Sequence, residues 1–275
     1  MSGIGETVAL GRGVKTWPVR LHAVTRYLRK WAAVLAVAAV WEVFPRLGLV
    51  DSTFLPPFSE VIAAWWELIA SGELAEHIAT SLARSLTGYV LALVYAIPLG
   101  IAIGWYKRFA DVINPLLEIL RNTAALALLP VFILLLGIGE ASKIALIIYA
   151  CSWPLLLNTI SGVRYVDPLL IKSAQSMGLS PIRLFQKVIL PAAIPTIFVG
   201  IRLAGASSIL VLVAAEMIGA KAGLGYLIIY AQYSFLIPEM YAGIVTISAI
   251  GFLFNLLLVK LERRFTAWKP SQTSE

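Results

Sequence analysis

Long apolar runs dominate the chain. Four of them are long enough for a spanning helix, which needs about 20 mostly apolar residues. These four runs are Leu86–Tyr106, Ile144–Val163, Pro195–Ala215 and Met240–Val259. We predict a fifth span over Leu116–Ile138, with Arg121 near its start, and a first span over Tyr27–Val50, which Glu42 and Pro45 interrupt. The pattern predicts an all-α membrane protein with about six transmembrane helices.

Composition agrees with lipid as the main solvent. The chain is 60% hydrophobic and 13% charged, whereas soluble domains are about 45–50% apolar and about 25% charged. Its net charge of +7 comes from basic residues scattered between apolar runs, without a nucleic-acid-binding module. The single cysteine, Cys151, excludes a disulfide framework within the chain. About thirty polar and basic residues precede the first apolar run, so we do not expect a cleavable signal.

The basic residues predict the orientation. With the N-terminus inside, all of the 22 Lys and Arg residues except Arg46, Arg84, Lys143 and Lys221 fall near the cytoplasmic side. Cytoplasmic loops carry this excess of basic residues. We therefore expect both termini in the cytoplasm. The predicted organisation is a basic N-terminal segment (1–30), one transmembrane domain (31–268) and a tail (269–275).

Two shorter segments are expected on the outer side. The first is an amphipathic helix with Ser59 as its N-cap and one apolar face, formed by Ile62, Trp65, Trp66 and Ile69. This helix lies in the membrane interface or packs as an external helix. The second segment, 223–229, is apolar but too short to span, so we expect it to fold back into the protein.

Residues 167–195 form an unusual basic insertion between two spans. Asp167 caps a helix with Pro168 in its first turn, and Gly178 follows as a left-handed C′ residue. A second helix starts at Ser180-Pro181, and Pro191 and Pro195 are expected to end it. Each arm of this elbow has an apolar stripe, formed by Leu170, Ile171, Ala174 and Met177 and by Ile182, Phe185, Val188 and Ile189. These stripes need a partner, either the chain's own helices or another protein.

The elbow closely resembles the loop that defines permease subunits of bacterial ABC importers. The family pattern is Glu-Ala-Ala, three residues, Gly, nine residues, Ile, one residue and Leu-Pro. Four positions match: Ala174, Gly178, Leu190 and Pro191. Val188 stands for the Ile, Ser173 for the first Ala, and Lys172 for the Glu, which reverses a charge. The spacing from the glycine to Leu-Pro is intact.

The resemblance continues along most of the chain and is greatest to the aliphatic sulfonate, taurine and nitrate branch. Ten segments carry it: 55–57, 71–74, 81–84, 120–122, 126–130, 137–143, 157–159, 162–164, 215–218 and 223–226. The chain departs from the branch at Leu135-Leu136, where Trp-Phe is usual, and at 205–208, where Gly-x-x-Trp is frequent.

The resemblance implies a type I ABC importer permease fold for residues 31–268, in a bacterial inner membrane. It also implies a homodimer that binds two cytoplasmic ATPases and receives a small organic anion, most often a sulfonate or taurine, from an outer binding protein. In that family the glycine loop is a coupling helix seated in a cleft of the ATPase. The residues expected to couple in this way are Lys172, Ser173, Ala174, Met177, Gly178, Leu179, Ser180, Pro181, Leu184 and Phe185.

The remaining chemistry fits a transport subunit without an enzymatic site. The sequence has no phosphate-loop motif, so ATP and Mg²⁺ would be bound by a partner. We find no catalytic constellation and expect no cofactor or metal bound by this chain. Polar residues at membrane depth are candidates for the transport path or for structural pairs. They are Arg84, Asn122, Thr123, Asn158, Arg202, Ser207, Ser208 and Glu216.

Two ion pairs are predicted, and two other functions stay open. Arg84 and Glu216 lie near the outer ends of their spans and could pair, and Glu118 could pair with Arg121 three residues later. The same transporter class could carry nitrate or another small solute. An ion-coupled secondary transporter could instead use Glu216 and Arg84.

Overall fold

The computed structural model describes residues 19–266, which are helical and contain no strand. The chain divides into two compact units, with the boundary after Ser59, and each unit is described by itself. The predicted tail and most of the predicted basic N-terminal segment lie outside the described residues.

The first unit contains α1 (Val19–Arg46) and the start of α2 (Phe58–Ala70). Helix α1 ends before Val50, so the predicted boundaries of the first span are wrong. Within residues 19–266, α1 is not among the helices long and apolar enough to cross a membrane. The predicted cap at Ser59 is also wrong, because Ser59 lies inside α2. Its N–H and its hydroxyl donate to the Glu42 carboxylate, at 2.9 and 3.0 Å.

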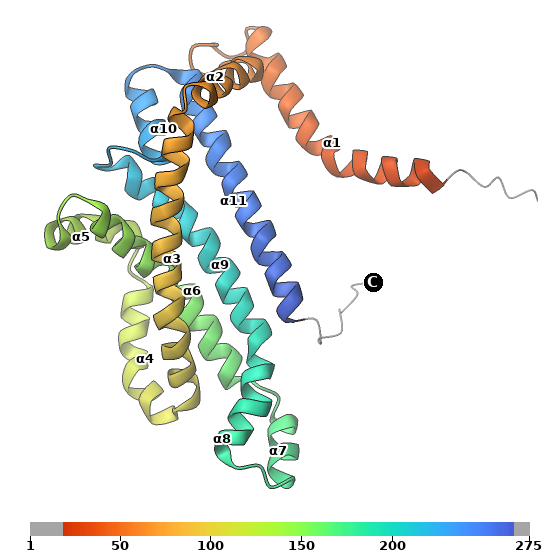
Figure 1. The fold of residues 1–275 in the computed structure, drawn as a ribbon, viewed down its shortest axis with the longest axis vertical. Coiled ribbons are helices and arrows are strands. Elements are labelled where there is room, and N and C mark those ends of the chain that lie inside the picture. The colour runs from red at the N-terminus through yellow and green to blue at the C-terminus, as the bar shows by residue number, and fades with distance from the viewer. Residues whose placement is uncertain (1–18, 267–275) are drawn as a thin grey trace, which may run out of the picture. The chain divides into compact units, whose positions relative to one another are not determined.

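Four long helices are the main elements of the second unit, together with several shorter ones (Figure 1). They are α3 (Glu73–Trp105), α6 (Glu140–Arg164), α9 (Leu190–Met217) and α11 (Ile237–Phe265). Each is apolar enough to cross a membrane, and together they contain the four clearest predicted spans, apart from Tyr106. Small residues let α3 approach α6 closely. A Cβ on Gly88 would lie 2.7 Å from Ile147, and one on Gly100 would lie 2.8 Å from Thr159.

The predicted span Leu116–Ile138 is not one straight helix. Helix α4 (Lys107–Arg121) is followed by a 3-10 turn, η1 (Ala125–Leu128), and by α5 (Leu129–Leu136), and the pair is bent by 87°. The Asn122 and Thr123 side chains donate hydrogen bonds to the backbone carbonyls of Glu118 and Ile119, four residues back. Such local side-chain bonds compete with helix continuation. The described residues therefore hold four spans, or five if the bent pair counts as one.

The two short segments predicted on the outer side are both helical. Helix α10 (Leu224–Tyr233) folds back as predicted, with Leu224, Leu227 and Ile228 buried. Helix α2 has two apolar faces instead of one. Its buried face carries Val61, Ala64 and Leu68, whereas Ile62, Trp66 and Ile69 are exposed. Trp65 is half-buried and does not share the exposed face with the other three residues predicted there, because its indole N–H donates to the Thr246 hydroxyl at 2.9 Å.

The elbow consists of α7 (Pro168–Ser176), α8 (Pro181–Leu184) and a π-helical turn, η2 (Phe185–Ile189), that leads into α9. The predicted helix end at Pro191 and Pro195 is wrong, because the chain stays helical from Pro181 to Met217. The π turn explains the continuation: the Leu190 N–H donates to the Phe185 carbonyl, five residues back. This wider turn lies directly before Pro191, whose missing N–H would otherwise disturb the helix.

Candidate functional site

Local interactions hold the elbow in the predicted shape. The Asp167 side chain caps α7 by accepting the Leu169 N–H at 2.8 Å. Gly178 has φ +72°, in the left-handed region, and its N–H donates to the Gln175 carbonyl at 2.9 Å. Ser180 stands at the N-cap position of α8 but makes no side-chain cap bond. The glycine and Asp167 thus have the conformations expected from the sequence, whereas the Ser180 side chain does not.

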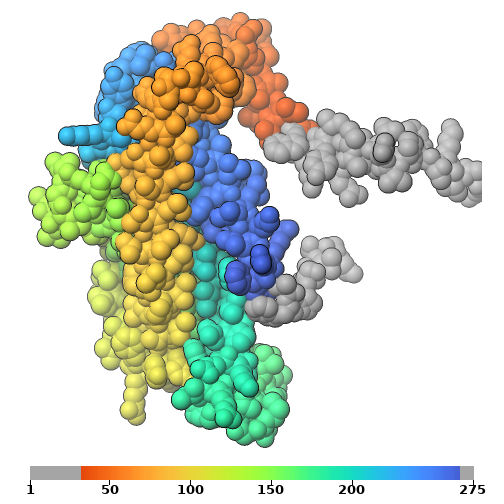
Figure 2. Space-filling view, in the orientation of Figure 1, coloured from red at the N-terminus to blue at the C-terminus, as the bar shows by residue number. Residues whose placement is uncertain are grey.

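One face of the elbow is packed against the rest of the chain and the other is exposed. Ala174, Leu184 and Ile189 are buried in one cluster, and the Phe185 ring packs edge-on against Trp105 with a centroid distance of 5.0 Å. On the exposed face, Met177 is 73% and Ile182 is 71% exposed. In the space-filling view the elbow is a lobe at one end of the second unit (Figure 2). Its predicted apolar stripes are therefore only partly covered by the chain itself.

The predicted coupling residues divide between these faces. Ala174 and Leu184 are buried, and Leu179 and Phe185 are half-buried. The others are exposed on the elbow: Lys172, Ser173, Met177, Gly178, Ser180 and Pro181. The exposed members are available to another protein, whereas the buried ones fix the elbow to the helix ends.

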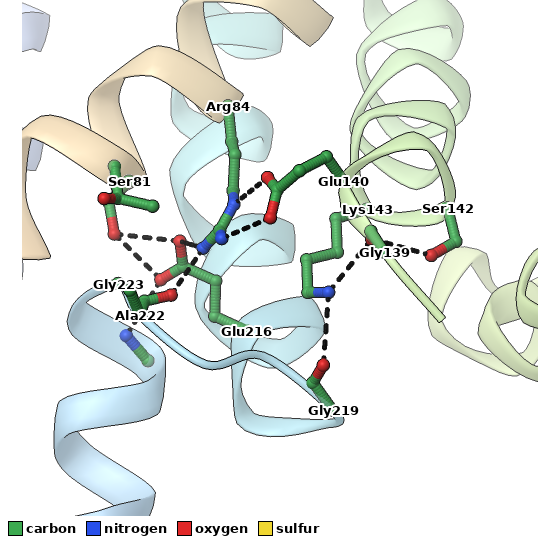
Figure 3. A network of polar contacts seen from close by, with 12 residues as sticks. Ser81, Arg84, Gly139, Glu140, Ser142, Lys143, Glu216, Gly219, Ala222 and Gly223 are labelled. Carbon is green, nitrogen blue, oxygen red and sulfur yellow. Dashed lines mark hydrogen bonds and ion pairs between the residues drawn. The ribbon is translucent and has the colours of Figure 1, made fainter. Parts of the chain in front are cut away.

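Arg84 and Glu216 form the predicted pair, inside a larger network that Figure 3 shows. The Arg84 guanidinium donates to the Glu216 carboxylate at 2.7 Å and to the Ala222 carbonyl at 2.6 Å. It also donates twice to the Glu140 carboxylate, once from Nε and once from Nη2. Glu216 is 1% and Arg84 is 5% exposed. Glu216 also accepts from the Ser81 hydroxyl and from the Gly225 N–H at 2.9 Å.

Two more side chains join the turn before α10 to α3 and α6. Buried Lys143 donates to the carbonyls of Gly139 and Gly219, at 3.0 and 3.4 Å. The His77 Nδ1 accepts the Gly223 N–H at 3.1 Å. The network holds two cations and two carboxylates, so its formal charge balances. The network holds α3, α6, α9 and the turn before α10 together, at the end of the unit away from the elbow (Figure 1). We call it the clamp; its side chains are those of His77, Ser81, Arg84, Glu140, Lys143 and Glu216.

Reasoning from the sequence missed Glu140, Lys143, Ser81 and His77 as members of this network. Ser81 and Arg84 are three residues apart, which places them on one face of a helix, and that spacing is the available signal. Glu140 and Lys143 have the same spacing near the start of α6. The partner of Glu140 is Arg84 on α3, and Lys143 joins its own helix end at Gly139 to Gly219 in the turn before α10. Since Arg84 and Gly219 are distant in sequence from α6, no local pattern reveals these contacts.

The other candidate residues are not brought together. Arg202 pairs with Glu262 at 3.0 Å, and Arg121 pairs with Glu118 at 3.1 Å. The Asn158 amide donates to the Pro154 carbonyl in its own helix. Four polar candidates lie at three further places: Asn122 and Thr123 at the end of α4, Ser208 buried beside Ser85, and Ser207 half-buried on α9. The candidates do not form a single polar site.

Comparison with known proteins agrees with this architecture. An aliphatic sulfonates transport permease of Bacillus subtilis is 37% identical over 235 residues, which cover 86% of this chain and 85% of that protein. The taurine transport system permease of Escherichia coli is 35% identical and covers 92% of each chain. A chain of the inward-facing MetNI methionine ABC transporter shares the fold, with a TM-score of 0.60 and 19% identity over 70% of this chain and 96% of that one.

The family described as the inner membrane component of binding-protein-dependent transport systems matches residues 96–267. This region includes the bent pair α4–α5, the elbow, the clamp residues on α6 and α9, and all of α10. Together with the spanning helices, the match shows that the chain is a multi-pass protein of the inner membrane and belongs to this permease family.

Proposed function

We propose that the chain is the permease subunit of an ABC importer that takes up a small organic anion, an aliphatic sulfonate or taurine. In this proposal two copies form the path, two cytoplasmic ATPases bind ATP and Mg²⁺, and an outer binding protein delivers the solute. Both termini face the cytoplasm. The substrate class rests on the relatives named for sulfonates and taurine.

The exposed apolar face of the elbow carries the proposal. Met177 and Ile182 are exposed on the elbow, which forms a lobe at one end of the second unit (Figure 2), whereas Ala174, Leu184 and Ile189 are already packed. Exposed apolar side chains next to basic and polar ones are typical of a protein-docking surface. Helix α9 continues directly from the elbow toward Glu216 in the clamp. A displacement of the elbow would therefore be transmitted along α9 to the opposite end of the bundle.

The clamp argues against an ion-coupled carrier that uses Arg84 and Glu216. Such a carrier needs an ionisable group that gains and loses a proton during transport. Glu216 instead accepts from Ser81, Arg84 and Gly225 at once. The oxygens of this carboxylate are thus already occupied by donors of the protein itself, which favours a structural role for Glu216.

Docking is tested by purifying the permease together with its neighbouring ATPase. Met177→Asp and Ile182→Asp should still insert in the membrane but should lose ATPase binding, because a charge is then desolvated in an apolar contact. Purified permease alone should show no ATP hydrolysis above a contaminant control. Full ATPase binding by both variants would contradict docking at the elbow.

The substrate is tested by growth of a deletion strain. We expect a defect with ethanesulfonate or taurine as the sulfur source and no defect with nitrate as the nitrogen source. Growth equal to wild type on both sulfur sources would contradict the sulfonate assignment. It would leave the ATPase-docking test unaffected.

A further inference from the structure

Helix α4 has one polar face that neither lipid nor the core accounts for. Asp111, Asn114, Glu118 and Arg121 follow one another at three- and four-residue spacing, which puts them on one side of the helix. Another side, with Val112, Leu116 and Ile119, is apolar and exposed, as a lipid-facing surface would be. Ile113 and Leu117 pack against the core.

The polar face of α4 borders a cavity shared with α6. The cavity measures about 510 Å³, within the range of about 300–1,000 Å³ typical of small-molecule sites. The lining residues with polar side chains are Asn114, Glu118, Arg121, Ser161, Arg164 and Tyr165. A second cavity of about 330 Å³, next to Lys107 and Asp111, also has Arg164 in its wall. Arg164 therefore borders both hollows.

The cavity runs along the end of α6, a helix long and apolar enough to cross a membrane. Its α6 wall runs from Leu157 to Arg164, the last residue of the helix, which corresponds to about 10 Å of helix. Arg121 is 39% and Glu118 is 65% exposed. Charged side chains are costly in hydrocarbon, so such residues face water, a partner or a ligand. The polar face of α4 is thus a wet surface.

The charges in this cavity are unbalanced. Glu118 makes one ion pair, with Arg121 at 3.1 Å, and within the described part of the chain Arg164 has no ion-pair partner. The cavity is thus lined by two arginines and one carboxylate. Each guanidinium has five N–H donors, so most of the donors of Arg121 and Arg164 are available to a ligand.

We propose that this α4–α6 cavity binds the anionic head group of the transported solute, a tetrahedral oxyanion such as a sulfonate, through Arg121 and Arg164. A planar guanidinium matches two oxygens of such a group, and Asn114 and Ser161 add neutral donors. Glu118 competes for Arg121 and keeps the affinity low enough for release. The assignment of the solute rests on the proposed function, whereas the oxyanion chemistry rests on the cavity.

The test uses the permease–ATPase complex in lipid nanodiscs, without a binding protein. Binding of radiolabelled ethanesulfonate and of inorganic sulfate is measured by equilibrium dialysis. Arg121→Gln and Arg164→Gln should each weaken binding about 10- to 100-fold, since each removes charge-assisted hydrogen bonds. Glu118→Gln should strengthen binding several-fold, because it releases Arg121. A role of Glu118 in folding alone would not raise affinity.

Arg108→Gln is the matched control, because Arg108 lies on the same helix, is exposed and borders neither cavity. It should bind both probes as wild type does. Wild-type affinity in Arg121→Gln and Arg164→Gln, or weaker binding in Glu118→Gln, would overturn the site. A wild-type complex that binds neither probe would overturn it too.

Two further arms separate the sources of the oxyanion. If the wild-type complex binds sulfate in the expected pattern but not ethanesulfonate, the site is supported and the sulfonate substrate is contradicted. Discs of phosphatidylcholine are compared with discs containing phosphatidylglycerol. Loss of solute binding only in the latter would identify a lipid phosphate as the occupant and overturn the assignment to the solute.

Discussion

Two arginines in the same bundle have opposite surroundings. Arg84 lies in the buried clamp and donates to two carboxylates and a carbonyl. Arg121 lies on the wall of a cavity, is 39% exposed and has one acidic partner in its own helix. Both are charged residues in spanning or near-spanning helices, which sequence alone treats alike. The number of N–H donors without an acceptor in the protein distinguishes the structural arginine, Arg84, from Arg121, which is available to a ligand.

Removing the central carboxylate of the clamp should have the largest effect. Glu216→Ala leaves Ser81, Arg84 and the Gly225 N–H without their shared acceptor. Breaking a buried ion pair by removing one partner costs about 3–5 kcal/mol. We expect a loss of that size in the free energy of unfolding, measured by denaturant titration in mixed micelles.

The control for this prediction is Glu216→Gln, which keeps the shape and one acceptor oxygen. It should destabilise less than Glu216→Ala. An Ala variant as stable as wild type would show that the clamp is dispensable, and Arg84 would then have to be considered for ligand binding as Arg121 is.

The sequence predicts contacts within an element better than contacts between elements. Asp167, Gly178 and the local pair Glu118–Arg121 have the predicted geometry, because their partners are within four residues. Glu140 pairs with Arg84 on a distant helix, and Lys143 reaches Gly219 in the turn before α10; apolar periodicity carries no signal for either contact. The bend after Arg121 was also missed, because hydropathy does not register the return of the Asn122 and Thr123 side chains to their own helix.

Gly223→Ala should have the second-largest effect. Gly223 has φ +119°, and a Cβ there would collide with the Glu216 carboxylate. A left-handed conformation costs a residue with a Cβ about 1–2 kcal/mol, and overpacking typically adds about 1–3 kcal/mol. The expected loss is therefore about 2–5 kcal/mol in the same titration.

Gly137→Ala isolates the collision. Gly137 has φ +82° but nothing within 4 Å of the position of a Cβ. It should lose only the conformational part, about 1–2 kcal/mol. Equal losses at Gly137 and Gly223 would mean that the turn before α10 can move away from Glu216, so the clamp would be less rigid than its contacts indicate.

Gly178→Val should destabilise the elbow moderately while affecting transport strongly. Gly178 has φ +72° with open space around it, so the cost is conformational, about 1–2 kcal/mol. Because the elbow is proposed to dock on the ATPase, pull-down and uptake should fall with it. Ser180→Ala is the control: its side chain makes no cap bond, so stability should change by less than about 0.5 kcal/mol. A variant Gly178→Val with full ATPase binding would contradict the coupling role.

Glu118→Gln should have the smallest effect on stability and is the variant that most directly contrasts with Glu216→Ala. A pair three residues apart on an exposed helix face contributes about 0.2–0.5 kcal/mol, so unfolding should change by no more than that. The same change should strengthen oxyanion binding, because Arg121 loses its only acidic partner among the described residues. A stability loss above about 1 kcal/mol, measured in the titration used for Glu216, would place Glu118 and Arg121 with the structural pairs. The difference between the two arginines would then disappear.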